Sequence, residues 1–62
     1  MPLSGKEMVK LYRKNGWKLD RIKGSHHIML NETTGETIPI PVHANRSLKK
    51  GLEQALLKKV KK

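Results

Sequence analysis

The sequence of 62 residues contains no cysteine and no phenylalanine, and its aromatic side chains are one tryptophan and one tyrosine. Without cysteine, the disulfide frameworks of small secreted domains and thiolate zinc sites are excluded. No apolar run is longer than that of residues 28–30, which is too short to cross a bilayer. The first residues lack the basic and then apolar segments of a signal peptide. We therefore expect a soluble cytoplasmic protein with no membrane partner.

Acidic residues are also scarce, since 5 Asp and Glu stand against 14 Lys and Arg, for a net charge of +9. This excess predicts a polyanionic partner, with nucleic acid the first candidate and an acidic protein the second. Five scattered carboxylates make a two-metal nuclease site hard to assemble. The sequence lacks the glycine-rich phosphate loop and the zinc-protease and serine-hydrolase motifs. We therefore expect neither a metal ion nor a cofactor.

The chain is long enough for one domain, residues 1–62, and too short for a second core. Leu, Ile and Val account for 15 of its 62 residues, a share just above the limit of about 20% below which chains tend to be disordered. Nearly every large apolar side chain is therefore needed for the core. For this reason we expect Tyr12 and Trp17 to be buried rather than stacked on the bases of a nucleic acid.

An amphipathic helix is predicted over residues 4–15. Ser4 and Glu7 have the spacing of a capping box, in which each side chain accepts a hydrogen bond from the backbone of the other residue. Gly16 suits the left-handed conformation that often ends a helix. The apolar residues at helical spacing are Met8, Leu11 and Tyr12. The cations on the opposite face are Lys6, Lys10, Arg13 and Lys14.

Three strands are predicted over residues 17–22, 25–30 and 36–42, separated by turn-forming residues at 23–24 and 31–35. Successive hairpins give an antiparallel sheet in which the strands follow chain order. Pro39 and Pro41 lie two apart in the third strand, so their missing N–H groups fall on one side, which is typical of an edge strand.

A second helix is predicted after residues 43–47, and residues 58–62 form a basic tail that we expect to fray. The predicted fold class is α+β, with two helices on one face of the sheet and the other face open to solvent. The apolar residues of this helix, at helical spacing, are Leu48, Leu52, Ala55, Leu56 and Val60.

The three histidines are the residues most suited to chemistry. His26 and His27 are neighbours on a predicted strand and point to opposite faces, so they cannot bind one metal ion together. Alternation leaves open which of them faces the helices. Ile28 and Leu30 share a face with His26, whereas Met29 shares one with His27. On composition alone, the simplest interpretation is a histidine tolerated in a half-exposed strand.

Three stretches of the sequence form an ordered set of short motifs. Gly-Trp, a short strand and Gly-Ser-His-His follow one another within residues 16–27, a Pro-x-His segment lies within residues 38–45, and Lys-Gly lies within residues 48–51. In this order the motifs resemble those of the HicA family of toxin mRNA interferases, in which Lys-Gly enters the last helix. The resemblance covers nearly the whole chain, from Ser4 to about Leu57.

The resemblance implies a double-stranded-RNA-binding-like fold, α-β-β-β-α, and ribosome-independent cleavage of mRNA. It also implies that His26 is the catalytic residue, that Gly24 shapes the turn before it, and that a HicB-type antitoxin is the partner. The sequence departs from the family at two places. Met29 stands where the family often has an aromatic residue, and Leu52-Glu53 replaces the usual Thr-Leu.

RNA supplies its own nucleophile, the 2′-hydroxyl, so a single histidine acting as general base or acid can promote cleavage without a metal. Lys18 and Arg21 lie near His26 in the sequence and are candidates for stabilising charge on the phosphate. His43 is the candidate for a second acid–base group, its alternative role being that of a loop residue. The residues expected to bind the substrate are Lys23, Gly24, Ser25, Lys6, Lys10, Arg13 and Lys14.

Two other functions fit the same composition. The first is a non-catalytic RNA-binding module, in which the lysines and arginines hold the phosphate backbone. The second is an interaction domain whose positive surface docks an acidic protein. In both cases the basic residues bind an anionic partner, and His26 has no catalytic role.

Overall fold

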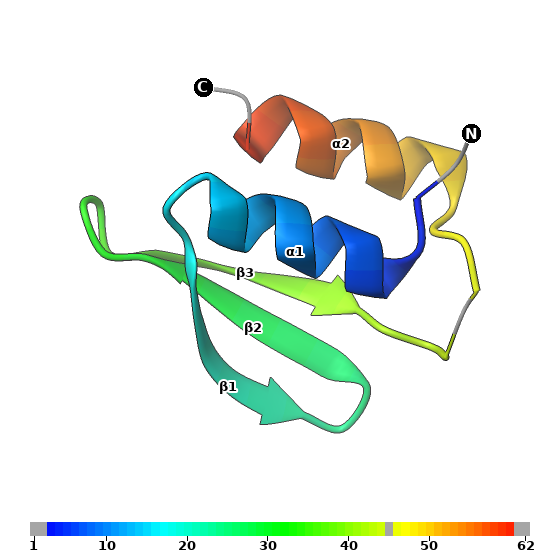
Figure 1. Ribbon diagram of the computed structural model, residues 1–62, viewed down its shortest axis with the longest axis horizontal. Coiled ribbons are helices and arrows are strands. Elements are labelled where there is room, and N and C mark those ends of the chain that lie inside the picture. The colour runs from blue at the N-terminus through cyan, green and yellow to red at the C-terminus, as the bar shows by residue number, and fades with distance from the viewer. Residues whose placement is uncertain (1–2, 45, 61–62) are drawn as a thin grey trace.

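A computed structural model describes residues 3–44 and 46–60 and contains two helices and three strands (Figure 1). Neither helix in this part of the chain is long and apolar enough to span a membrane. The elements in chain order are α1 (Gly5–Lys14), β1 (Lys18–Lys23), β2 (His26–Asn31), β3 (Glu36–Pro41) and α2 (Lys50–Val60).

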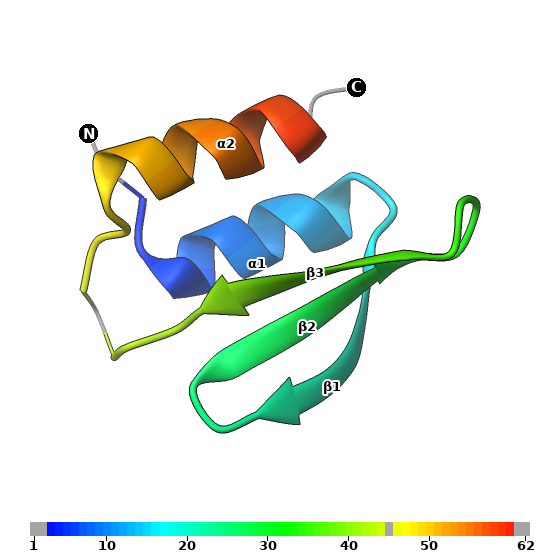
Figure 2. The ribbon, with the colours of Figure 1, turned by 180° about the vertical axis from the view of Figure 1, so that it is seen from behind.

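The strands form one antiparallel sheet in the order β1-β2-β3. Both helices lie on the same side of this sheet, with α1 between α2 and the strands (Figures 1 and 2). The other face is uncovered. The α-β-β-β-α order, the meander and the position of β3 at an edge confirm the predictions, and the arrangement is consistent with a double-stranded-RNA-binding-like fold.

The start of α1 has the predicted capping box. The Ser4 hydroxyl accepts a hydrogen bond from the Glu7 N–H at 3.2 Å, and the Glu7 carboxylate accepts one from the Ser4 N–H at 2.9 Å. These contacts satisfy two of the N–H groups that have no partner within the helix. Asn15 caps the end of α1, and Gly16 has a φ of 94°, which favours glycine.

The core lies between the helices and the covered face of the sheet. Tyr12 and Trp17 are both buried in it, as predicted, and their rings meet edge to face with centroids 4.9 Å apart. Met29 is fully buried as well, so a flexible methionine fills the place where the resemblance leads one to expect an aromatic ring. The buried apolar residues are Met8, Val9, Tyr12, Trp17, Met29, Ile40, Leu48, Leu56 and Val60.

The buried side of α2 differs from the prediction. Leu52 and Ala55 were expected on its apolar face, but both are exposed, and Glu53 is buried instead. The reason is a polar contact that periodicity does not reveal, because the Glu53 carboxylate accepts a hydrogen bond from the Leu3 N–H at 2.5 Å. Leu56 and Val60 are buried, as predicted.

The C-terminal tail also differs in part from the prediction. Residues 58–60, which the sequence predicts to fray, belong to α2, and Val60 is buried in the core. Residues 61–62, the other part of the predicted tail, lie outside the described residues.

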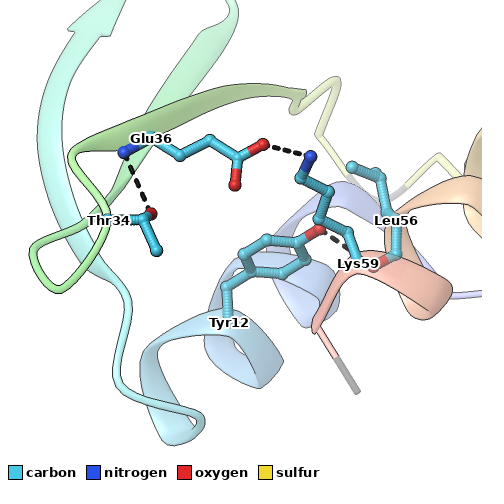
Figure 3. A network of polar contacts seen from close by, with 5 residues as sticks. All are labelled: Tyr12, Thr34, Glu36, Leu56 and Lys59. Carbon is cyan, nitrogen blue, oxygen red and sulfur yellow. Dashed lines mark hydrogen bonds and ion pairs between the residues drawn. The ribbon is translucent and has the colours of Figure 1, made fainter. Parts of the chain in front are cut away.

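A polar network joins α1, α2 and the start of β3 (Figure 3). The Tyr12 hydroxyl donates a hydrogen bond to the Leu56 carbonyl at 2.9 Å, and the Lys59 ammonium pairs with the Glu36 carboxylate. Burial, with the nearby negative charge of Glu36 as the smaller cause, raises the pKa of Tyr12 from its usual 10.0 to about 12. The phenol is therefore held in its neutral form.

This raised pKa predicts an alkaline loss of stability. A folded-state pKa above the unfolded value means that the stabilising effect of Tyr12 is fully present below pH 10 and is lost as the pH rises to about 12. Tyr12→Phe lacks the titrating hydroxyl, but it also loses a hydrogen bond worth about 1 kcal/mol. We expect urea unfolding to show wild type as the more stable protein at pH 9, with the difference shrinking by pH 12. The lysines are the same in both proteins, so their titration cancels in this difference. A difference in the free energy of unfolding that stays constant from pH 9 to pH 12 would contradict the prediction.

Candidate functional site

His26 opens β2 and is exposed, whereas His27 is half-buried. Met29 lies two residues after His27, on the same face, and is fully buried beneath the helices. His26 therefore projects from the open face of the sheet, and His27 from the covered face. This settles the alternative that the sequence left open.

The strand register places His26 between two neighbours on the open face. Lys23 of β1 is its partner on one side and Pro41 of β3 is its partner on the other. The next row on this face has Ile28 in the middle, with Arg21 opposite it on β1. Directly opposed residues share a face of the sheet, so Lys23 and Arg21 both accompany His26.

A β-bulge brings a third cation to this face. The register shifts between Leu19 and Arg21, so that Lys18 pairs with Leu30 while Arg21 pairs with Ile28. Without the extra residue, strict alternation would place Lys18 on the opposite face from Arg21. We call Lys18, Arg21 and Lys23 the β1 basic row. Sequence reasoning listed these residues as near His26 but could not assign their faces.

Two members of the β1 basic row have acidic neighbours. The Lys18 ammonium lies 3.2 Å from a Glu32 carboxylate oxygen, and the Arg21 guanidinium lies 3.7 Å from one of Asp20. Both cationic side chains are 68% exposed. Ion pairs this exposed contribute little to stability. The two cations can therefore exchange their partners for another anion at small cost.

The turn before His26 is formed by Gly24 and Ser25. Gly24 has a φ of 61°, in the left-handed region that residues with a Cβ rarely adopt. The Ser25 carbonyl accepts a hydrogen bond from the Val42 N–H at 2.7 Å. The turn thus leads directly into His26 and is held against the end of β3.

The cations of α1 do not lie beside His26. Lys6, Lys10 and Arg13 line a cavity of about 250 Å³ together with His27 and with Leu19, which pairs with Met29 and so shares the covered face. Lys14 is exposed and is not among the lining residues. The substrate-binding residues predicted from the sequence are therefore divided, with Lys23, Gly24 and Ser25 at His26 and the helix cations across the sheet.

His43 follows the end of β3 and is exposed. It lines a cavity of about 340 Å³ with Pro41, the cross-strand partner of His26. Arg46 and Lys49 line the same cavity, and sequence reasoning did not single them out. The only signal in the sequence was the recurrence of a cation three and six residues after His43.

Within the described ranges 3–44 and 46–60, no three His, Asp or Glu side chains gather as a potential metal site. The histidine on the open face is His26, and the β1 basic row lies beside it, with Glu32 and Asp20 next to Lys18 and Arg21. A neutral imidazole there can accept a proton, and three nearby cations can stabilise negative charge. The arrangement is suited to proton transfer at a polyanion.

Comparison with known proteins gives one match. A protein-family model described as "HicA toxin of bacterial toxin-antitoxin" matches residues 5–61, a span that includes all five elements and the three histidines. No curated protein and no solved structure matches the chain.

Proposed function

The chain belongs to the HicA family of toxins from bacterial toxin–antitoxin systems, and we propose that it is an endoribonuclease that cleaves mRNA without a metal ion and without the ribosome. The observation that carries this proposal is the position of His26. The histidine is exposed on the open face of the sheet, with Lys23 directly opposite it and the rest of the β1 basic row beyond.

The proposed reaction uses the RNA's own 2′-hydroxyl. Neutral His26 removes the proton of this hydroxyl, the 2′-oxygen attacks the adjacent phosphorus, and the bond from phosphorus to the 5′-oxygen breaks. The products are a 2′,3′-cyclic phosphate and, after protonation of the 5′-oxygen, a 5′-hydroxyl. One general acid–base group typically contributes about 10²–10⁴-fold.

The β1 basic row would bind the phosphates of the strand. Successive rows on one face of a sheet are two residues apart, which corresponds to about 6.8 Å. An extended single strand laid along β1 can therefore bring consecutive phosphates to Lys18, Arg21 and Lys23, with the scissile one nearest His26. Lys23 is the member of the row opposite His26, so it would stabilise the charge that develops on that phosphate.

The cations of α1 have a separate role in this proposal. Lys6, Lys10 and Arg13 lie on the covered side of the sheet, so only RNA that passes around the edge at β1 could reach them as well as His26. We expect these residues, with Lys14, to raise the affinity for RNA through phosphate contacts without affecting the chemical step.

A HicA toxin implies a cognate antitoxin as its partner. We propose a HicB-type antitoxin with an acidic surface that covers the open face. The chain's net charge of +9 favours such a partner. Binding there would bury His26 and the β1 basic row together and so block access of RNA.

The purified protein tests the proposal with a single-stranded RNA and the DNA of the same sequence, both in buffer with EDTA. We expect the RNA to be cleaved and the DNA to remain intact, because DNA lacks the 2′-hydroxyl. Cleavage that EDTA abolishes and added metal restores would contradict the proposal. Binding of RNA in a gel shift without cleavage would instead indicate an RNA-binding module. Absence of both would indicate a domain that docks an acidic protein.

A further inference from the structure

The cavity at the end of β3 combines a histidine with two cations. His43, Arg46 and Lys49 line it together with apolar residues that include Pro41 and Leu52. Its volume is about 340 Å³.

Pro41 connects this cavity to His26, because it lines the cavity and is also the cross-strand partner of His26. His26 pairs with Pro41, and the hydrogen bond from the Val42 N–H to the Ser25 carbonyl, at 2.7 Å, continues the pairing by one residue. His43 is the next residue along. His43 therefore lies two residues beyond the partner of His26, just past the end of β3.

The backbone after His43 turns back toward the cavity. The His43 carbonyl accepts a hydrogen bond from the Arg46 N–H at 2.9 Å, which closes a tight turn. Ala44 within this turn has a φ of 51°, the only positive value for a non-glycine residue in the described part of the chain. Such a conformation is unfavourable for alanine and recurs at functional sites. Here it brings Arg46 to the same cavity as His43.

We infer that this cavity holds the nucleotide on the leaving side of the scissile phosphate and that His43 is the general acid of the reaction. Arg46 and Lys49 would contact the phosphate, and the apolar wall of Pro41 and Leu52 would contact the sugar and base. The inference rests on the proposed function, because it assigns the second proton transfer of that reaction to a residue on the neighbouring strand.

The two histidines then divide the proton transfers. Neutral His26 accepts the proton of the 2′-hydroxyl while the 2′-oxygen forms its bond to phosphorus. The bond from phosphorus to the 5′-oxygen breaks, and protonated His43 donates its proton to that oxygen. One proton is taken up and one is released, and exchange with water restores both side chains. Histidine suits both roles because each of its forms is populated near neutral pH.

A substrate whose leaving group needs no proton tests this assignment. In the RNA, sulfur replaces the bridging 5′-oxygen at one position, and a thiolate leaves without a general acid because thiols are far more acidic than alcohols. We expect His43→Ala to slow cleavage of ordinary RNA by about 10²–10⁴-fold and cleavage of the sulfur-containing RNA by less than about tenfold. His26→Ala should slow both. His43 is exposed, and circular dichroism checks that each variant folds.

Three other results would contradict the assignment of His43 as the general acid. Equal rates for His43→Ala and wild type on ordinary RNA would overturn the inference and leave the proposed function standing. An equally large loss on both substrates would also overturn it, because a residue that only positions the RNA is not rescued by a better leaving group. Failure of the wild-type protein to cleave either substrate would overturn the proposed function, and the inference with it.

Discussion

Replacing His26 by alanine should slow RNA cleavage by at least about 10²–10⁴-fold, the usual contribution of one general acid–base group. The side chain is exposed and makes no hydrogen bond to the described residues, so its removal should leave the fold intact. The β1 basic row is also unchanged, and RNA binding should persist. Single-turnover cleavage rates and a gel shift on the same RNA measure the two effects separately.

His27 provides the matched control for this experiment. It is the next residue along β2 and has the same side chain, but it projects from the covered face, where its Nδ1 is buried without a hydrogen-bond partner. His27 lines the cavity of the α1 cations, so the comparison is made at saturating protein, where His27→Gln should cleave RNA at a rate within a few-fold of wild type. A wild-type rate for His26→Ala would reject the assignment. Equal losses in both variants would show that the strand, rather than one imidazole, had been disturbed.

Replacing Gly5 by alanine should cause a large loss of stability, because Gly5 is the one glycine of this domain where an added Cβ meets neighbouring atoms within 4 Å. Gly5 begins α1 and packs against the backbone at the end of β3. A Cβ at this position would overlap the Pro41 carbonyl oxygen and lie 2.9 Å from the Cα of Val42. Backbone atoms cannot rotate away as a side chain can. We expect the free energy of unfolding to fall by about 3 kcal/mol and the melting temperature by at least about 10 °C.

Gly51 is the control for this substitution. It lies in the first turn of α2, and a Cβ there meets nothing within 4 Å. Gly51→Ala should leave stability unchanged or raise it by up to about 1 kcal/mol, because alanine favours the helix. Thermal melts of the two variants check both expectations. Equal melting temperatures for the two variants would contradict the close packing of α1 on the end of β3.

The fold could be predicted from the sequence largely because its signals are local. The capping box of Ser4 and Glu7 fixed the start of α1, and Pro39 and Pro41 marked β3 as an edge strand. Each signal concerns residues a few positions apart. Glu53 illustrates the limit of this reasoning, because its buried hydrogen bond to Leu3 joins residues 50 positions apart. Helical periodicity therefore predicted a buried Leu52 where the structure has an exposed one.

The candidate site was less predictable for similar reasons. The β-bulge after Leu19 places Lys18 on the face of Arg21, and strict alternation would separate them. The face of His26 could not be decided either, since Ile28 and Leu30 make the open face look as apolar as a core. Arg46 and Lys49 lie beside His43 only because of the turn that includes Ala44.

The mass of the cleavage products tests the central claim most directly. A short RNA with one cleavage site is incubated with wild-type protein in EDTA, and both fragments are analysed by mass spectrometry. Attack by the 2′-oxygen predicts an upstream fragment that ends in a 2′,3′-cyclic phosphate and a downstream fragment that begins with a 5′-hydroxyl. An upstream fragment ending in a 3′-hydroxyl, with phosphate on the downstream one, would mean that water is the nucleophile and would contradict the account.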